Sequence, residues 1–376
     1  MYVNKLLKYC KSVKLFEGAE PSDNQQQYTT YPQQMKKHVS KHADTYISYL
    51  LKNHSFDVVH VEGYYLLQHV PTKCSVPILL VEHNIEHLLA LQRFKVATTQ
   101  TEKNSLWLEY IKTLKNEQIA WKRATVCVTL THEDKISMEI LDPNIEVKNI
   151  PNGIDHQKKL DDSVCTHLPD NLENPPISSN RPSILFVGNF AYAPNVDAAL
   201  YFSNDIFPLI LKEVPEVKLF LVGNAPTQEI YSLTTSNSQI EVTGRVASLV
   251  PFYRSADVVV CPLRIGGGVK VKVLEALGLG KAIVSTSIGV QGLDLSTYRA
   301  VAVADESGDF AENVIQLLQY PEERQIREQE ALAYARTLPT WDHISDAFAR
   351  LYEEMTNYMV SSSVKRDMKD QKEEQF

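Results

Sequence analysis

Short apolar runs alternate with longer stretches in which apolar residues recur at helical spacing. In the first half of the chain, four apolar runs predict strands and three amphipathic stretches predict helices. The strands are expected at residues 56–62, 76–83, 124–130 and 146–151, and the helices at 85–97, 102–122 and 133–141. Alternation of strand and helix favours a mostly parallel sheet that is covered by helices.

The second half repeats this pattern with five runs rich in Val, Ile, Leu or Phe, which predict strands buried on both faces. They lie at residues 183–189, 217–224, 240–244, 257–262 and 282–286. We therefore expect an α/β protein with two Rossmann-like domains, at residues 1–155 and 182–340. The polar stretch 156–181 predicts a linker, 341–360 a last helix, and the charged residues 361–376 a disordered tail.

The most informative segment runs from Cys261 to Thr286. A predicted strand ends at Cys261, the glycines Gly266, Gly267 and Gly268 follow, and a helix is expected from about Val269 to Leu279. Glycines let the backbone approach an anion closely, and the free N–H groups of a helix start attract phosphate. The pattern therefore predicts a phosphate-binding loop, with Lys270 and Lys272 adding positive charge.

Glu275 stands three residues after Lys272, on a similar side of the predicted helix. A carboxylate at this position could accept hydrogen bonds from ribose hydroxyls. The alternative interpretation is a solvated Lys–Glu pair beside a simple glycine turn. No GxGxxG, GxxxxGK[ST] or Asp-x-Asp motif occurs, so neither another type of phosphate loop nor a metal site of the Asp-x-Asp type is predicted.

Composition narrows the function classes. The formal net charge of -8 argues against binding nucleic acid through its backbone phosphates. Five scattered cysteines without a CxxC pair argue against a disulfide framework or a zinc site and favour a reducing compartment. No apolar run is long enough to span a membrane and no secretory signal is evident, so we expect a cytoplasmic protein.

The segment from Leu263 to Thr286 resembles the donor-site signature of the group 1 glycosyltransferases, also called glycosyltransferase family 4. Three further segments, at residues 184–202, 242–262 and 150–155, resemble other parts of that family in the same order. The resemblance covers roughly residues 56–359. It implies the GT-B fold, in which two Rossmann-like domains face each other, and transfer of a sugar from a nucleotide-diphosphate sugar, with retention of configuration and without a metal or other cofactor.

The resemblance also implies residue roles. Donor-binding residues would be Gly188, Asn189, Arg245, Gly266, Gly267, Gly268, Val269, Lys270, Lys272 and Glu275. Among these, Arg245 and Lys272 would stabilise the leaving diphosphate. Many members carry a pair of glutamates in the signature; Glu275 matches the second, and Gly267 stands at the first position. Contacts to the donor sugar would then come from backbone amides, as in a glycine-rich subgroup.

In the first half, His83 directly follows a predicted strand, where the family places a functional histidine. His83 is therefore a candidate catalytic residue, and a packed or capping histidine is the alternative. His60 and Glu62 at the preceding strand end are weaker candidates. The chain opens without the strand and Gly-Gly pair that begin the family's first domain, so we expect a first domain that lacks its initial βα units.

The helical region 91–123 carries several Lys and Arg residues together with Trp107, Leu108 and Trp121, which would suit a peripheral contact with the inner face of a membrane. Glu102, Glu109 and Glu117 interrupt that charge, so a plain solvated helix is the other interpretation. The predicted partners are a nucleotide-sugar donor and a saccharide or lipid-linked acceptor. Two alternative functions remain open: a nucleotide-sugar epimerase, and a non-catalytic subunit that binds the nucleotide sugar.

Overall fold

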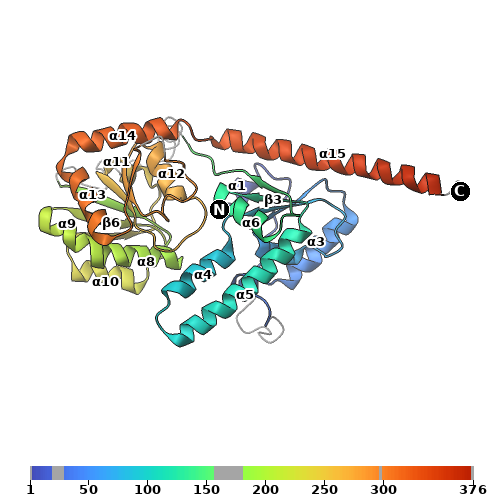
Figure 1. Ribbon diagram of the computed structural model, residues 1–376, viewed down its shortest axis with the longest axis horizontal. Helices are drawn as coiled ribbons and strands as arrows, with labels where there is room; N and C mark the ends of the chain where they lie inside the picture. Colours follow the sequence, from blue (N-terminus) through green and yellow to red (C-terminus); the bar gives the residue numbers. More distant parts are fainter. Residues whose placement is uncertain (1, 19–28, 156–180, 296–298, 374–376) are drawn as a thin grey trace. The chain divides into compact units, whose positions relative to one another are not determined.

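The computed structural model describes residues 2–18, 29–155, 181–295 and 299–373, and side chains up to Asn357. The chain divides into two compact units (Figure 1). Unit 1 comprises residues 1–129, 135–149 and 349–376, and unit 2 comprises residues 130–134 and 150–348. The predicted linker at 156–181 lies almost wholly outside the described residues. No helix in the described part of the chain is long and apolar enough to cross a membrane.

Unit 1 contains a four-stranded parallel sheet in the order β1-β2-β3-β4. The strands are β1 (Val59–Glu62), β2 (Ile78–Glu82), β3 (Val126–Thr129) and β4 (Val147–Asn149). β2 and β3 are buried along their whole length, as their continuous apolar sequence predicts. All four strands were predicted, with ends that are slightly too long.

The helices of unit 1 cover this sheet. They are α1 (Tyr2–Leu6), α2 (Gln33–Lys37), α3 (Lys41–Asn53), the 3-10 helix η1 (Tyr64–His69), α4 (Glu86–Val96) and α5 (Gln100–Arg123). Helices α4 and α5 pack along each other. Helices α6 (His132–Leu141) and α15 (Trp341–Glu373) contribute residues to both units. Among the described residues before Val59 there are helices and no strand.

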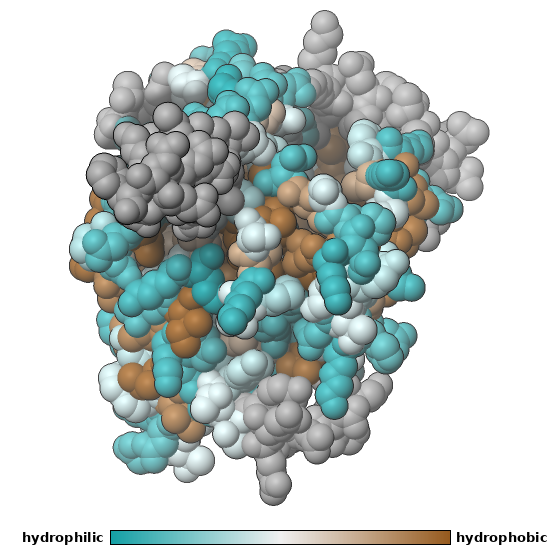
Figure 2. All heavy atoms as spheres, turned by 90° about the vertical axis from the view of Figure 1, so that its right-hand side faces the viewer, coloured by the Kyte–Doolittle hydropathy of each residue, from teal (hydrophilic) through white to brown (hydrophobic). Residues whose placement is uncertain are grey.

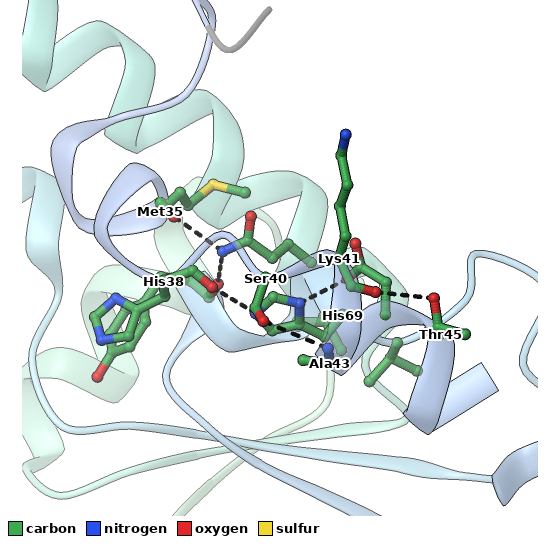
Figure 3. Close-up of polar contacts among 12 residues, drawn as sticks. Met35, His38, Ser40, Lys41, Ala43, Thr45 and His69 are labelled. Atoms are coloured by element: carbon green, nitrogen blue, oxygen red, sulfur yellow. Dashed lines mark hydrogen bonds and ion pairs between the residues drawn. The ribbon is translucent and has the colours of Figure 1, made fainter. Parts of the chain in front are cut away.

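His69 connects η1 to the helices that precede the sheet through hydrogen bonds (Figure 3). Its Nδ1 lies 2.7 Å from Asp44 Oδ1 on α3, and its Nε2 lies 2.7 Å from the His38 carbonyl after α2. Ser40 accepts a hydrogen bond from the Ala43 N–H, which caps the start of α3. Side-chain hydrogen bonds, and not strand pairing, therefore connect the described segment before β1 to η1.

The surface of unit 1 is mixed. Seen from the right-hand side of Figure 1, hydrophobic residues lie in patches between hydrophilic ones (Figure 2). Large apolar side chains of unit 1 that are exposed include Leu15, Tyr49, Trp107, Leu108, Ile111 and Ile119.

Unit 2 contains a six-stranded parallel sheet in the order β10-β9-β8-β5-β6-β7. Its strands are β5 (Ser183–Val187), β6 (Lys218–Val222), β7 (Ile240–Gly244), β8 (Val258–Cys261), β9 (Ala282–Ser285) and β10 (Val301–Val303). The first five were predicted. β10 was not, because three residues are too few for a periodic pattern to emerge.

Helices cover both faces of this sheet. They are α8 (Ala193–Tyr201), the π-helix η2 (Phe202–Ile206), α9 (Phe207–Glu213), α10 (Gln228–Ser236), α11 (Val250–Ser255), α12 (Val271–Gly278), α13 (Ser307–Gln319) and α14 (Pro321–Ala335). In Figure 1, α8, α9 and α10 lie on one side of the sheet, and α11, α12 and α14 lie on the other. This is the doubly wound arrangement expected of a Rossmann-like domain.

Two predicted boundaries differ from the structure. Residues 150–155 were assigned to the first domain but belong to unit 2, where Ile154 pairs with Thr340 and its N–H bonds the Pro339 carbonyl. Helix α15 continues through residues 361–373, where a disordered tail was predicted. Extending an existing helix needs no new nucleation, and residues 361–373 include three Lys and one Arg, which favour helix.

Candidate functional site

The strand order of unit 2 brings two predicted loops to one place. β5 and β8 are neighbours, and the chain leaves β5 toward β6 on one side and β8 toward β9 on the other. Ligands of open parallel sheets bind at the carboxyl ends of strands, at this switch point. Gly188 and Asn189 follow β5, and the loop that contains Gly266, Gly267 and Gly268 follows β8.

Lys272 joins the first of these loops to α12. Its Nζ donates a 2.8 Å hydrogen bond to Asn195 Oδ1 at the start of α8, and Asn195 Nδ2 donates to the Asn189 carbonyl at 2.9 Å. The same ammonium lies 4.5 Å from the centre of the Phe186 ring on β5. Burial lowers the pKa of Lys272. A partly desolvated cation therefore stands at the end of β5, where its field is weakly screened.

Lys270 has a different partner from Lys272. Its Nζ donates to the carbonyl oxygens of Gly267 at 2.9 Å and Gly268 at 2.7 Å. In a trans peptide the N–H points opposite to the C=O, so the N–H groups of Gly268 and Val269 point away from Lys270. Gly268 has φ +60°, a conformation that favours glycine. Lys270 thus organises the loop, and burial lowers its pKa to about 8.

Glu275 lies on α12, which begins at Val271, two residues after the predicted start. Its Oε2 lies 3.0 Å from the Tyr253 hydroxyl on α11, and burial raises the pKa of this carboxyl group. Lys272 and Glu275 therefore have different partners in the structure, and they do not form the solvated pair that was the alternative interpretation. Gly280, predicted to end the helix, has φ +64° and does so.

Residues after β9 and on α8 form hydrogen bonds and an ion pair with the loop that follows β8. Thr286 Oγ1, after β9, donates a 2.6 Å hydrogen bond to the Leu263 carbonyl, and Ser285 Oγ donates to the Cys261 carbonyl at 3.2 Å. Arg264 forms a bidentate pair with Asp197 on α8, at 2.5 and 3.1 Å. The glycine loop is therefore attached to the elements on either side of it.

Arg245 follows Gly244, whose carbonyl accepts a 3.2 Å hydrogen bond from the Gly223 N–H beside Gly188. It follows β7, an edge strand, and its side chain is exposed. In the sheet, β5 and β6 stand between β7 and β8, so the strand order separates Arg245 from the glycine loop. Its predicted role at the diphosphate stays a prediction.

His83 lies in unit 1, directly after β2. Its Nε2 lies 2.7 Å from Glu62 Oε2 at the end of β1, and the hydrogen bond to this carboxylate raises the pKa of His83. Glu62 also contacts His60, whose Nε2 lies 3.0 Å from Oε1. The structure thus brings together His83 and the two residues that the sequence marked as weaker candidates.

Comparison with known proteins tests the predicted family. Residues 181–320 match the family described as "Glycosyl transferases group 1". Residues 181–320 form a group 1 glycosyltransferase domain. This range contains the strands β5 to β10 and both loops of the switch point, so the donor-site residues named above lie within the group 1 domain.

One relative matches part of the chain. An uncharacterized 44.6 kDa protein in the cps region of Klebsiella pneumoniae is 29% identical over 140 residues, which are 35% of this chain and 36% of that protein. The match thus spans about a third of the relative's length.

Among solved structures, sucrose-phosphate synthase from Thermosynechococcus elongatus is similar with a TM-score of 0.64 and 14% identity, over 86% of this chain and 82% of that one. A UDP-forming alpha,alpha-trehalose-phosphate synthase from Burkholderia xenovorans has a TM-score of 0.60 and 15% identity, over 84% and 78%. The fold is therefore that of the GT-B glycosyltransferases, which confirms the predicted fold.

Sequence reasoning missed several residues of the site. Asn195, Phe186, Tyr253 and the Arg264–Asp197 pair were not singled out, although Arg264 immediately precedes the glycine loop segment. Asn195 and Lys272 are 77 positions apart, so no local spacing connects them. Only the pairing of β5 with β8 brings these residues together.

Proposed function

We propose that the chain transfers a sugar from a nucleoside-diphosphate sugar to a saccharide or lipid-linked acceptor. The observation that carries the proposal is the switch point of unit 2. There the Lys272 ammonium lies beside Asn195 and Phe186, and the Gly268 and Val269 N–H groups of the loop after β8 point away from Lys270. Cations and backbone amides are the groups that bind a diphosphate. The group 1 family match of the same residues supports this ligand.

In this proposal the protein works mainly by stabilising the departing diphosphate. Negative charge grows on the leaving oxygen as the bond to the anomeric carbon breaks, and fixed donors lower the energy of that state. Lys272 supplies the charge, the loop amides supply hydrogen bonds, and Glu275 holds the ribose. No metal ion takes part, and the anomeric configuration is retained. The similar trehalose-phosphate synthase is UDP-forming, which makes uridine diphosphate the first nucleotide to test.

The test measures nucleotide affinity and turnover together. Calorimetry with uridine and guanosine diphosphate is expected to show binding to the full chain. Replacing Lys272 by Ala or Met should weaken that binding by about 10- to 100-fold, because a hydrogen bond to a charged group is lost. Lys272→Met retains an apolar stem over Phe186 and separates the loss of charge from the loss of packing. The control is Lys212→Ala, which removes an exposed lysine of α9.

Product analysis separates the alternatives. Release of nucleoside diphosphate from its sugar, faster with an acceptor, supports transfer. Donor binding without turnover would indicate a binding subunit, and an isomerised donor without acceptor would indicate an epimerase. Equal nucleotide affinity in the wild type and both Lys272 variants would overturn the proposed site.

We further propose that α5 contacts the inner face of a membrane. Trp107, Leu108, Ile111 and Ile119 are 44–53% exposed on this helix, and Lys103, Lys112 and Lys115 lie among them. Glu117, which the sequence counted against a basic face, is fully buried and contributes no surface charge. Exposed apolar residues beside lysines suit an anionic lipid surface.

Cosedimentation with vesicles tests this contact. The wild type is expected to bind phosphatidylglycerol vesicles more strongly than phosphatidylcholine vesicles, and added salt should weaken the binding. Replacing both Leu108 and Ile111 by Glu should abolish it, while Ile326→Glu, a matched change on α14, should not. Binding that is indifferent to lipid charge, or equal in all three proteins, would reject a contact through α5.

A further inference from the structure

Tyr253 contacts two of the proposed donor-site residues of unit 2. It lies on α11, and its hydroxyl is 3.0 Å from Glu275 Oε2 and 3.2 Å from the Lys272 carbonyl oxygen, both on α12. The two helices lie on the same side of the sheet (Figure 1), and all three residues belong to unit 2. Tyr253 is 22 positions from Glu275 and 19 from Lys272, so tertiary structure and not local spacing makes these contacts.

The proton of the contact with Glu275 belongs to Tyr253. Burial, and after it the negative charge of Glu275, raise the pKa of the Tyr253 phenol, so the phenol stays protonated at neutral pH. A phenol has a single hydrogen to donate, and the Glu275 carboxyl oxygen is the nearer of its two acceptors. Tyr253 therefore donates to Glu275 Oε2.

The other carboxyl oxygen of Glu275 is available to a ligand. In the part of the chain that the structure describes, the hydrogen bond to this carboxyl group goes to Oε2, and none goes to Oε1. Glu275 is partly exposed, so a solute can reach it. Tyr253 is only 1% exposed and belongs to the core of unit 2, so a bound ligand would touch Glu275 and not Tyr253.

A buried partner makes Glu275 a better ligand for a hydroxyl group. A free glutamate side chain loses rotamer freedom when it binds, and that loss opposes binding. The Tyr253 ring is fixed by core packing, so its hydroxyl holds one carboxyl oxygen in place before a ligand arrives. The remaining oxygen is then already oriented.

We propose that Tyr253 is a positioning residue, which orients Glu275 so that Oε1 accepts a hydrogen bond from a ribose hydroxyl of the nucleotide. The inference rests on the proposed function, in which Glu275 holds the ribose. Tyr253 acts through Glu275 alone. Its hydroxyl should therefore matter for nucleotides that carry ribose hydroxyls and not for nucleotides that lack them.

The experiment compares uridine diphosphate with dideoxyuridine diphosphate, which lacks both ribose hydroxyls. Calorimetry on the full chain gives a dissociation constant for each, and their ratio measures what the hydroxyls contribute. In the wild type the dideoxy compound should bind about 10-fold more weakly or worse, because hydrogen bonds to a charged group are lost. Tyr253→Phe should reduce this ratio to about 3-fold or less and leave the affinity for the dideoxy compound unchanged.

Further variants separate positioning from packing. Glu275→Asp keeps the charge but is one methylene group shorter, so it loses the Tyr253 contact and should lower the ratio as far as Tyr253→Phe does. Adding Tyr253→Phe to Glu275→Ala should lower the ratio no further than Glu275→Ala alone, because the two residues act as one unit. Tyr334→Phe changes another buried tyrosine of unit 2, on α14, and should leave the ratio at the wild-type value.

The outcomes distinguish this inference from the function on which it rests. A wild-type ratio in Tyr253→Phe, or equal weakening of both nucleotides in that variant, would overturn the positioning role. Glu275→Asp decides the question even if Tyr253→Phe does not fold, because a wild-type ratio in this variant would also overturn it. A wild-type chain that binds neither nucleotide would overturn the proposed function, and this inference with it.

Discussion

At the scale of single residues, Lys270 and Lys272 show why identical side chains two positions apart can differ in role. Both were predicted to add charge to a phosphate site. Residues at i and i+2 point to different sides of a helix start. Lys272 consequently reaches Asn195, whereas Lys270 turns back to the Gly267 and Gly268 carbonyls. The residue types were predictable from the sequence, but the atoms they contact were not.

Gly223 is a second residue whose importance only the structure shows. A Cβ atom placed there would stand 1.8 Å from the Gly188 carbonyl oxygen, and φ is +154°. Because backbone cannot yield as a flexible side chain can, any larger residue must displace the turn after β5. Gly223 therefore fixes the position of Gly188, a predicted donor-binding residue.

Gly223→Ala is accordingly expected to lower the free energy of unfolding by about 2–4 kcal/mol, as overpacked and strained positions do. It should also weaken nucleotide binding. Gly308→Ala is the matched control, because nothing lies within 4 Å of its added Cβ and the residue is part of α13. That variant should be unchanged or about 0.5 kcal/mol more stable. Denaturation in urea measures both, and equal stabilities would contradict the packing argument.

At the scale of elements, the start of α4 depends on a carboxylate from α5. Helix α4 has no side-chain cap of its own. The fully buried Glu117 instead accepts hydrogen bonds from the Glu86 N–H at 2.7 Å and the His87 N–H at 3.2 Å, and it also contacts the His87 ring at 2.5 Å. An anion at a helix N-terminus satisfies free N–H groups and the helix dipole.

Glu117→Ala should therefore lower the free energy of unfolding by about 3–5 kcal/mol, because it leaves buried donors without an acceptor and opens a cavity. Glu102→Ala, an exposed change in the first turn of the same helix, should cost no more than about 0.5 kcal/mol. Calorimetric or urea denaturation of the two variants checks this. A Glu117→Ala protein as stable as the wild type would show that α4 does not need this cap.

At the scale of the whole molecule, two α/β units, each with a parallel sheet, were predictable because buried parallel strands are continuous apolar runs. The unit boundary was less predictable. Residues 150–155 were predicted to end the first domain. In the structure, Gly153 lies against the Trp341 backbone and Asp155 lies beside Gly278 on α12. The polar stretch 156–181 predicts a linker, but packing decides to which unit the residues just before it belong.

The sequence by itself determined the fold class, nearly all the strands and the glycine loop with its helix, because each of these depends on spacings within a short window. The resemblance to the group 1 glycosyltransferases rests on four segments that occur in the same order as in that family. Tertiary structure alone decided which residues meet. The sheet order places β5 beside β8 and β1 beside β2, and so joins Lys272 to Asn195 and His83 to Glu62. Such pairings depend on burial summed over whole sheets, and no local pattern of residues carries that information.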